Sequence, residues 1–314
     1  MEGGTTMSRF THRSTKRALL TIAAEYAIVT GSIAIAAGVP DTGWPVKALA
    51  ILVIGTRQYA LSEALLHEAS HWHLSNSKSV NDLLGVILAW PVFTSLAGYR
   101  RFHNRLHHGL DIADPENSIW GDYEDWGLPG PSRTLGRACA CWLLVLRPAI
   151  GLTGIMHLFK TVRNFGYDFD LWETRLMLSA WAVVIAGAAY FSLWRELILY
   201  WLIPYTFIFL TLLYWAEVED HYRVSGAKTR SHLNWFYNFI SHNLGYHALH
   251  HKYSSIPWFR LPEAYRAHKA EIVEQVSRGF WETFAQIIAY TPPHEEQLEP
   301  QMPAVSESEA AVVP

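Results

Sequence analysis

Apolar residues occur in six long blocks along this chain, separated by polar stretches. The blocks cover residues 18–38, 46–66, 80–97, 139–156, 176–194 and 196–216. A helix needs about 20 residues to cross roughly 30 Å of hydrocarbon, so the blocks are long enough to be membrane segments. Their apolar residues are nearly continuous and do not follow one face of a helix. The pattern predicts an all-α integral membrane protein.

Turn-like stretches join the blocks into hairpins. Residues 39–45 connect the first two blocks, and residues 193–196 connect the last two. Basic residues flank the outer ends of these hairpins, and few lie in the turns. Because cytosolic segments are enriched in Lys and Arg, both termini are expected in the cytosol. The predicted organisation is a cytosolic segment at 1–17, a membrane domain at 18–292 and a disordered polar tail at 293–314.

The composition supports the membrane interpretation. Half of the residues are hydrophobic and only 17% are charged, whereas soluble domains usually have about a quarter charged. The formal net charge of −3 does not indicate a nucleic-acid partner. The two cysteines, Cys139 and Cys141, are spaced poorly for a disulfide, so they do not indicate an oxidising compartment.

Histidines form the main chemical signal, because most of the 16 occur in tight clusters. Two clusters have i, i+4 pairs that share one face of an α-helix: His67-Glu-Ala-Ser-His71 and His103-Asn-Arg-Leu-His107-His108. In the second, the additional His108 can turn toward another metal. A third cluster, His247-Ala-Leu-His250-His251, places its three rings on one face, and His221 follows the last apolar block.

A single metal site requires all clusters on one side of the membrane, and this restricts the number of spans. If blocks 80–97 and 139–156 crossed the bilayer, the clusters would face opposite sides. Pro91 interrupts the first of these blocks, and Arg147-Pro148 interrupts the second. We therefore expect both blocks to be re-entrant or interfacial, which leaves four spanning helices beneath a cytosolic helical cap that carries the clusters.

Two charged residues, Glu25 and Arg57, lie within predicted spans at similar depths. Pairing between adjacent helices would relieve the cost of burying them. Alternatively, Arg57 extends toward the interface or faces a polar cavity.

The clusters favour a site with more than one metal. His67-Glu-Ala-Ser-His71 alone also matches the H-E-x-x-H pattern of zinc proteases, in which Glu68 would be the base. A membrane zinc protease leaves the other clusters unexplained, and a lipid-binding or sensor protein would not need complete clusters. Nine clustered imidazoles exceed the needs of one tetrahedral zinc ion and suit two metals with open positions for O2.

The order of these clusters resembles the membrane fatty acid desaturase and hydroxylase superfamily, whose boxes read HxxxH, HxxxHH and HxxHH. The local sequence around Gly98-Tyr-Arg-Arg-Phe-His103, Asp114-Pro-Glu116 and Ile256-Pro-Trp-Phe-Arg-Leu-Pro262 is similar to its bacterial acyl-lipid desaturases. The resemblance covers about residues 45–265. It implies the metal ligands His67, His71, His103, His107, His108, His221, His247, His250 and His251.

Relatives carry an asparagine four residues before the histidine that corresponds to His221, where this chain has Glu217. Glu217 is therefore a further candidate ligand, bound directly or through water; alternatively it faces solvent or Arg223. His242 and Asn243 match family positions outside the ligand face and are expected to support the ligands. Asp114 and Glu116 are expected to orient the ligands or to cap a loop.

The resemblance implies two non-haem iron ions, O2 as co-substrate, and desaturation of a fatty-acyl or lipid-like chain. Hydroxylation, ketolation or another monooxygenation of a lipophilic substrate is the alternative on the same scaffold. No redox domain is recognisable in the sequence. A separate donor of the ferredoxin, rubredoxin or cytochrome b5 type is therefore expected, with membrane lipids as the other partners.

Overall fold

The computed structural model describes residues 7–39, 43–111, 114 and 116–291. Within these ranges the chain is mostly helical, as predicted. The strands found there form one small parallel sheet of β1 (Arg230–His232) and β2 (Gln275–Ser277). The predicted tail at 293–314 and the first six residues of the N-terminal segment lie outside the described residues.

Three helices are long and apolar enough to cross a membrane. The first is α1 (Thr15–Gly38), which has 24 residues. The second has 27 residues and joins α2 (Trp44–Tyr59), the π-helical η2 (Ala60–Leu66) and α3 (His67–Ser70). The third has 28 residues and joins α11 (Trp194–Leu197), η6 (Ile198–Leu202), η7 (Pro204–Phe209) and α12 (Leu210–His221).

Two further apolar segments are sharply bent. The first bends by 97° between α4–η3 (Lys78–Ala89 and Trp90–Val92) and α5–η4 (Leu96–Arg100 and Arg101–His107). The second bends by 78° between α7–η5–α8 (Arg137–Cys141, Trp142–Leu146 and Arg147–Ala149) and α9 (Leu152–Tyr167). Pro91 and Pro148 precede these bends, and Phe93 and Gly151, which have left-handed backbone conformations, lie within them. These are the two interruptions expected from the sequence.

The number of spans lies between three and five, depending on whether each bent segment counts as one. Helix α10 (Trp172–Tyr190), which overlaps the predicted span at 176–194, is not among the three long apolar helices. It nevertheless exposes large apolar side chains, with Val183 72% and Tyr190 82% exposed. Four spanning helices therefore stay a prediction.

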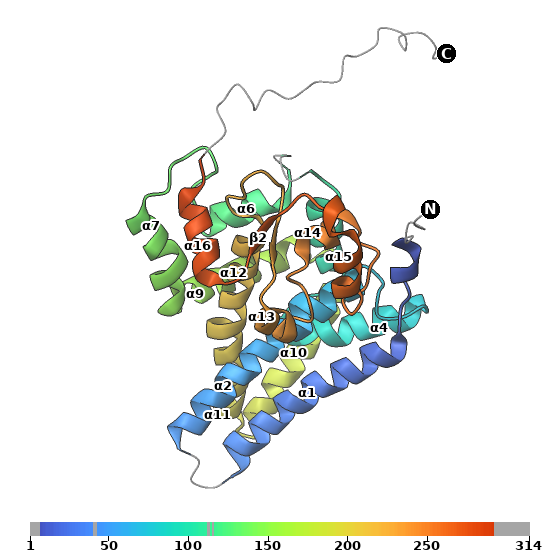
Figure 1. Ribbon diagram of the computed structural model, residues 1–314. Coiled ribbons are helices and arrows are strands. Elements are labelled where there is room, and N and C mark those ends of the chain that lie inside the picture. The colour runs from blue at the N-terminus through green and yellow to red at the C-terminus, as the bar shows by residue number, and fades with distance from the viewer. Residues whose placement is uncertain (1–6, 40–42, 112–113, 115, 292–314) are drawn as a thin grey trace, which may run out of the picture.

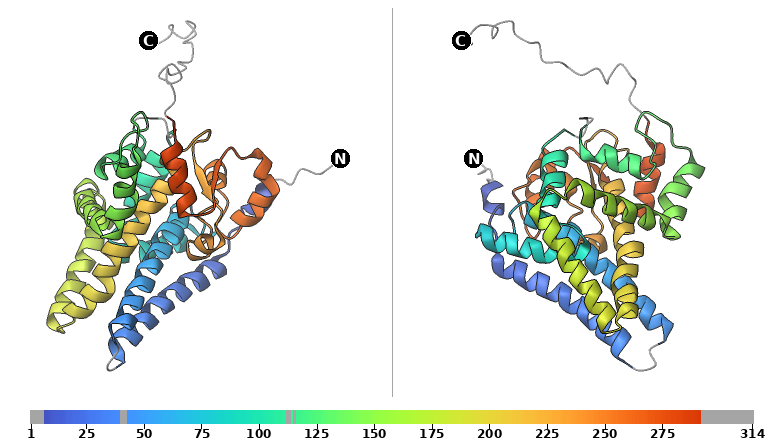
Figure 2. Two further views of the ribbon diagram at one scale, coloured as in Figure 1. Left: turned by 60° about the vertical axis from the view of Figure 1, so that its left-hand side comes forward. Right: turned by 180° about the vertical axis from the view of Figure 1, so that it is seen from behind.

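The long helices carry a cap of shorter elements at one end. Figures 1 and 2 show the α1–α2 and α10–α11 hairpins reaching away from the cap, while η1 and α16 lie at the cap end. The cap comprises the sheet with η1 (Met7–Phe10), α6 (Ser118–Asp125), α13 (Trp235–Ile240), α14 (His247–Lys252), α15 (Leu261–His268), η8 (Lys269–Glu271) and α16 (Phe280–Ala289). The first and last described elements thus lie on the same side of the bundle.

The predicted pairing of Glu25 and Arg57 is confirmed. Nη1 of Arg57 lies 3.1 Å from one Glu25 carboxylate oxygen and 3.2 Å from the other, and both side chains are buried. Nε2 of His242 lies 2.9 Å from the same carboxylate, and Nη2 of Arg57 reaches the Ile240 carbonyl at 3.5 Å. These contacts join α1 and α2 to the segment that precedes the third histidine cluster.

Candidate metal centre

The nine predicted ligands gather where the long helices meet the cap. Each side chain offers one nitrogen to one of two groups, and the nitrogens within a group all lie within 4.8 Å of one another. Group A contains His67, His71, His103, His108 and His250, and group B contains His107, His221, His247 and His251. Segments separated by more than 100 residues thus converge on two points, as the clusters suggested.

The second cluster is divided between the groups in a way that α-helical spacing did not predict. His103 and His108 belong to group A, while His107 belongs to group B. The expectation that His103 and His107 share a face is wrong because η4 is π-helical, with a hydrogen bond of 2.9 Å from the His108 N–H to the His103 carbonyl. In a π-turn the backbone hydrogen bonds join residues five apart, so the side chains are rotated from the positions that α-helical spacing gives them.

The third cluster is also divided, since His250 contributes to group A and His247 and His251 to group B. The expectation that all three rings share one face of the helix is therefore wrong. At 100° per residue, His250 and His251 point to different sides of α14, so this helix lies between the groups. The rings of His108 and His251 stack at 4.2 Å between centroids, which makes the groups direct neighbours.

The donor atoms suit metal binding. Several buried ring nitrogens have no hydrogen-bond partner among the described residues, including Nε2 of His71, His103, His108 and His251 and both nitrogens of His250. Unpaired buried polar atoms are rare in folded proteins and call for an explanation. Nε2 of His221 and Nε2 of His247 also face each other at 2.8 Å. A metal ion in each group would bind one nitrogen of each of these rings.

Burial keeps the cap histidines neutral. Loss of hydration lowers the pKa of His108 to about 2, and repulsion from the neighbouring His107 and His67 rings adds to this effect. The pKa values of His247, His250 and His251 are well below the usual range for the same reasons. A neutral imidazole has a free lone pair, which is the form that binds metal.

Glu68 supports the first cluster from inside the protein. Its fully buried carboxylate accepts hydrogen bonds from His73 Nδ1 at 2.7 Å and from the Trp258 N–H at 3.0 Å. It therefore ties the end of α3 to the segment after the third cluster. A zinc protease would need this carboxylate free to act as a base, so the structure gives no support to that reading of His67-Glu-Ala-Ser-His71.

The loop after the second cluster is organised by Asn117, which the sequence analysis missed. Its buried Nδ2 donates to the carbonyls of His107, Leu110 and Asp111 at 3.1–3.3 Å, while Oδ1 accepts from the Ile119 N–H at the start of α6. Of the expected supporting residues, Asp114 accepts the N–H of Glu116 at 2.8 Å. That contact is a loop cap, the second of the two roles considered for Asp114 and Glu116.

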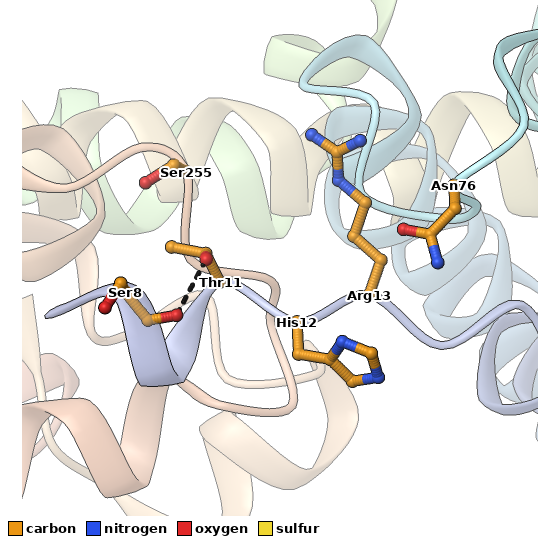
Figure 3. Close-up of a pocket in the computed structure, with 6 residues that line it drawn as sticks. All are labelled: Ser8, Thr11, His12, Arg13, Asn76 and Ser255. Carbon is orange, nitrogen blue, oxygen red and sulfur yellow. Dashed lines mark hydrogen bonds between the residues drawn. The ribbon is translucent and has the colours of Figure 1, made fainter.

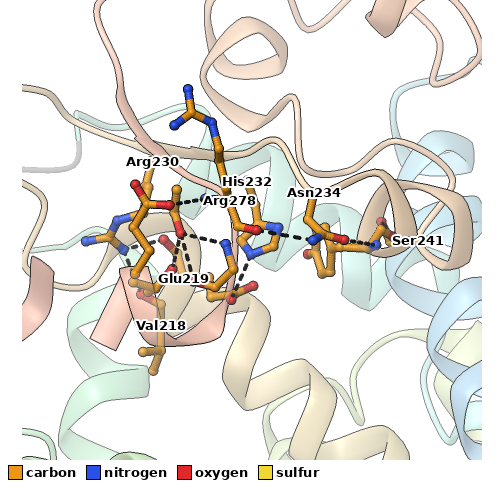
Figure 4. A network of polar contacts seen from close by, with 12 residues as sticks. Val218, Glu219, Arg230, His232, Asn234, Ser241 and Arg278 are labelled. Carbon is orange, nitrogen blue, oxygen red and sulfur yellow. Dashed lines mark hydrogen bonds and ion pairs between the residues drawn. The ribbon is translucent and has the colours of Figure 1, made fainter. Parts of the chain in front are cut away.

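A buried network surrounds the end of α12, the helix whose last residue is His221, and Figure 4 shows its members Glu219, Arg230 and His232. Arg230, which is fully buried, donates to the backbone carbonyls of Glu219, Val218, Tyr222 and Arg223. One Glu219 carboxylate oxygen lies 3.4 Å from Nε2 of His232. In the same turn, an Asp220 oxygen lies 3.4 Å from Nδ1 of His247, where it can orient that ring for group B.

His242 and Asn243 have left-handed backbone conformations, with φ of 51° and 70°. His242 contacts Glu25, and Nδ2 of Asn243 donates to the Trp258 carbonyl at 3.2 Å. Both residues shape the turn before His247, and their hydrogen bonds go to Glu25 and Trp258 rather than to a ligand histidine. Their predicted support of the metal ligands stays a prediction.

A cavity of about 440 Å³ adjoins group A. His103 is part of its wall, and so are Tyr99, Phe102 and Met177. Glu217 lines this cavity and belongs to neither histidine group. Ligation by Glu217 stays a prediction. Glu63, which sequence reasoning missed, lines the same cavity.

A second pocket lies beside the N-terminal segment, away from the predicted ligands. It is lined by Ser8, Thr11, His12, Arg13, Asn76 and Ser255, and the Thr11 hydroxyl donates to the Ser8 carbonyl (Figure 3). Its only histidine, His12, is exposed. The pocket therefore offers none of the convergent nitrogen donors of groups A and B.

Comparison with known proteins agrees with this geometry. Residues 42–283 match a family model described as fatty acid desaturase, and this range contains all nine histidines of the two groups. A curated relative, dihydrorhizobitoxine desaturase of Bradyrhizobium elkanii, is 25% identical over 281 residues. The match covers 82% of this chain and 75% of the relative.

Proposed function

The chain belongs to the fatty acid desaturase family, and we propose that it is a membrane-bound desaturase whose nine histidines hold two iron ions that use O2. Family membership makes it a desaturase-type oxidoreductase of the membrane with a lipophilic substrate. The observation that supports the di-iron proposal is the convergence of nine imidazoles into two adjacent groups. The relative's name, which describes a desaturase, supports desaturation.

The donor set favours iron over structural zinc. Structural zinc sites are closed and tetrahedral and are built from four protein ligands, often including thiolates. Group A offers five nitrogens, and neither Cys139 nor Cys141 belongs to a group. Imidazole-rich sites with higher coordination numbers suit iron, which can keep positions open for O2. When bound, such a centre supplies O2 activation and hydrogen abstraction from an unactivated C–H bond.

The residues of this chain position the substrate and exclude water. The cavity beside His103 would bring a substrate carbon next to group A, while the Tyr99 and Phe102 side chains shield the reaction from solvent. Asn117, Glu68 and Arg230 keep the segments that carry the histidines in place. Electrons would come from a separate ferredoxin, rubredoxin or cytochrome b5 on the cytosolic side, where we also place both termini.

Elemental analysis of the purified full-length protein tests the proposal directly. We expect about two irons per chain and iron-dependent O2 consumption. His108→Ala should remove iron from group A and His221→Ala from group B, whereas the matched His12→Ala, at an exposed histidine, should retain both irons. One stoichiometric zinc without iron-dependent activity would contradict the proposal.

A further inference from the structure

The wall of the cavity beside group A contains more charge than a hydrocarbon chain needs. Five carboxylates and three cations line it: Glu63, Asp122, Asp125, Asp168, Glu217, Arg101, Lys160 and Arg163. Apolar side chains form much of this wall, as an acyl chain would need, but a cavity built only for such a chain would have few charged groups. The charged residues therefore indicate which class of substrate the cavity binds.

Each cation in this wall already has a carboxylate partner. Arg101 contacts Asp168 at 3.3 Å, and Arg163 donates to Asp125 at 2.9 Å. The Lys160 ammonium is bonded to Asp122. All three cations of the wall and three of its five carboxylates are therefore paired with one another.

The two remaining carboxylates, Glu63 and Glu217, have no hydrogen bond or ion pair to any residue that the structure describes. Both residues line the same cavity, and both are half-buried. A charge without a partner is costly where water is partly excluded, so a cavity wall with two such carboxylates favours a positively charged occupant.

A buried histidine points to the same kind of partner. His157 is 6% exposed, lines the cavity and has no hydrogen-bond partner at Nδ1. A neutral imidazole has a lone pair at one ring nitrogen, and Nδ1 of His157 is that acceptor in the tautomer protonated at Nε2. Glu63, Glu217 and His157 together form an acceptor set, which an ammonium group with three N–H donors matches.

The two glutamates hold equivalent positions relative to the histidine groups. Glu63 precedes His67 of group A by four residues, and Glu217 precedes His221 of group B by four residues. Each therefore lies about one helical turn from a predicted ligand. Neither carboxylate belongs to a group of converging donors, so both remain available to a molecule in the cavity.

We propose that Glu63 and Glu217 select a substrate that carries an amine, and that they hold its ammonium group in the cavity beside group A. The substrate class would then be an amine-bearing molecule with a short apolar part, in place of a plain fatty-acyl chain. This inference rests on the proposed desaturase function, because it assigns the cavity to the substrate of that reaction.

The test compares three four-carbon probes on the iron-loaded full-length protein in lipid nanodiscs, by isothermal titration calorimetry. Butylammonium should bind at least about tenfold more tightly than 1-butanol or butyrate, since hydrogen bonds to a charged partner are the strong ones. Glu63→Gln and Glu217→Gln should each weaken butylammonium binding about tenfold, with iron content and butanol binding unchanged. The matched control Glu124→Gln, at an exposed residue of α6 outside the cavity wall, should bind like wild type.

Two results would overturn the inference. Equal binding of butylammonium and 1-butanol to the iron-loaded wild type would show that the cavity does not select a cation. Loss of iron from Glu63→Gln or Glu217→Gln would assign these carboxylates to the metals. Failure of the proposed function is measured separately, because it would appear as wild-type protein that does not bind iron, before any probe is added.

Discussion

Replacement of Arg57 by methionine should destabilise the protein strongly, because it leaves a carboxylate buried without its main partner. Arg57 contacts both oxygens of Glu25, and the two residues are 9% and 5% exposed. In Arg57→Met, His242 is the remaining hydrogen-bond partner that the structure gives this carboxylate. Removal of one partner of a buried ion pair costs about 3–5 kcal/mol, so we expect a loss of about 3 kcal/mol after allowing for His242.

The double variant Glu25→Gln/Arg57→Met separates the charge effect from packing. It removes both charges and keeps side chains of similar length, so we expect it to lose less than about 1.5 kcal/mol, since replacing a buried pair by apolar groups is often near neutral. The double-mutant cycle should then give a coupling energy of about 2 kcal/mol or more. Arg195→Met, at an exposed arginine of α11, is the matched control and should change stability by less than about 0.5 kcal/mol.

Equilibrium unfolding in mixed detergent–SDS micelles, followed by tryptophan fluorescence, gives the free energies. The chain has 14 tryptophans, so the signal is adequate. Additive effects of the two single substitutions would refute the reasoning, because the pair would then contribute no coupling. An Arg57→Met variant as stable as Arg195→Met would refute it as well.

Three other perturbations test the surroundings of the histidines. Asn117→Ala should cost about 1–3 kcal/mol and weaken iron binding, because three carbonyls of the second-cluster loop lose their donor; the unfolding and iron titrations check this. The metal-free protein should lose stability as the pH falls below about 6.5, because histidines are protonated in the unfolded chain at that pH while the folded ones, such as His108 with a pKa of about 2, stay neutral. Stability should return above that pH. A pH series of unfolding midpoints measures this, and His108→Asn should show a shallower dependence on pH. Accessibility tags after Gly109 and in the 40–45 turn should report opposite sides of the membrane, and the same side for both would contradict the proposed topology.

The sequence predicted which nine histidines come together in the fold, but not how they divide between groups A and B. Spacing rules assume 3.6 residues per turn, and they correctly placed His67 and His71 together. They failed for His103, His107 and His108 because η4 is π-helical. A π-turn depends on how the helix is packed against its neighbours, and local sequence carries little sign of it.

The residues that support the ligands were harder to predict, for differing reasons. Glu68 was visible as part of His67-Glu-Ala-Ser-His71, but its contact with Trp258 joins residues 190 positions apart. Arg230 is a buried cation whose hydrogen bonds go mainly to backbone carbonyls, so no residue pattern reveals its partners. Glu63 did have a signal, since it precedes His67 by the same four residues that separate Glu217 from His221.

Because segments are shared between the groups, we expect binding of the proposed metals to be coupled to docking of the cap. Helix α14 supplies His250 to group A and His247 and His251 to group B, and η4 likewise supplies both groups. Neither group can therefore be completed by the membrane helices alone, which contribute His67 and His221 but not the histidines of α14. Because the ligands converge only in the folded chain, the free energy of binding the proposed metals would stabilise the packing of the cap against the bundle.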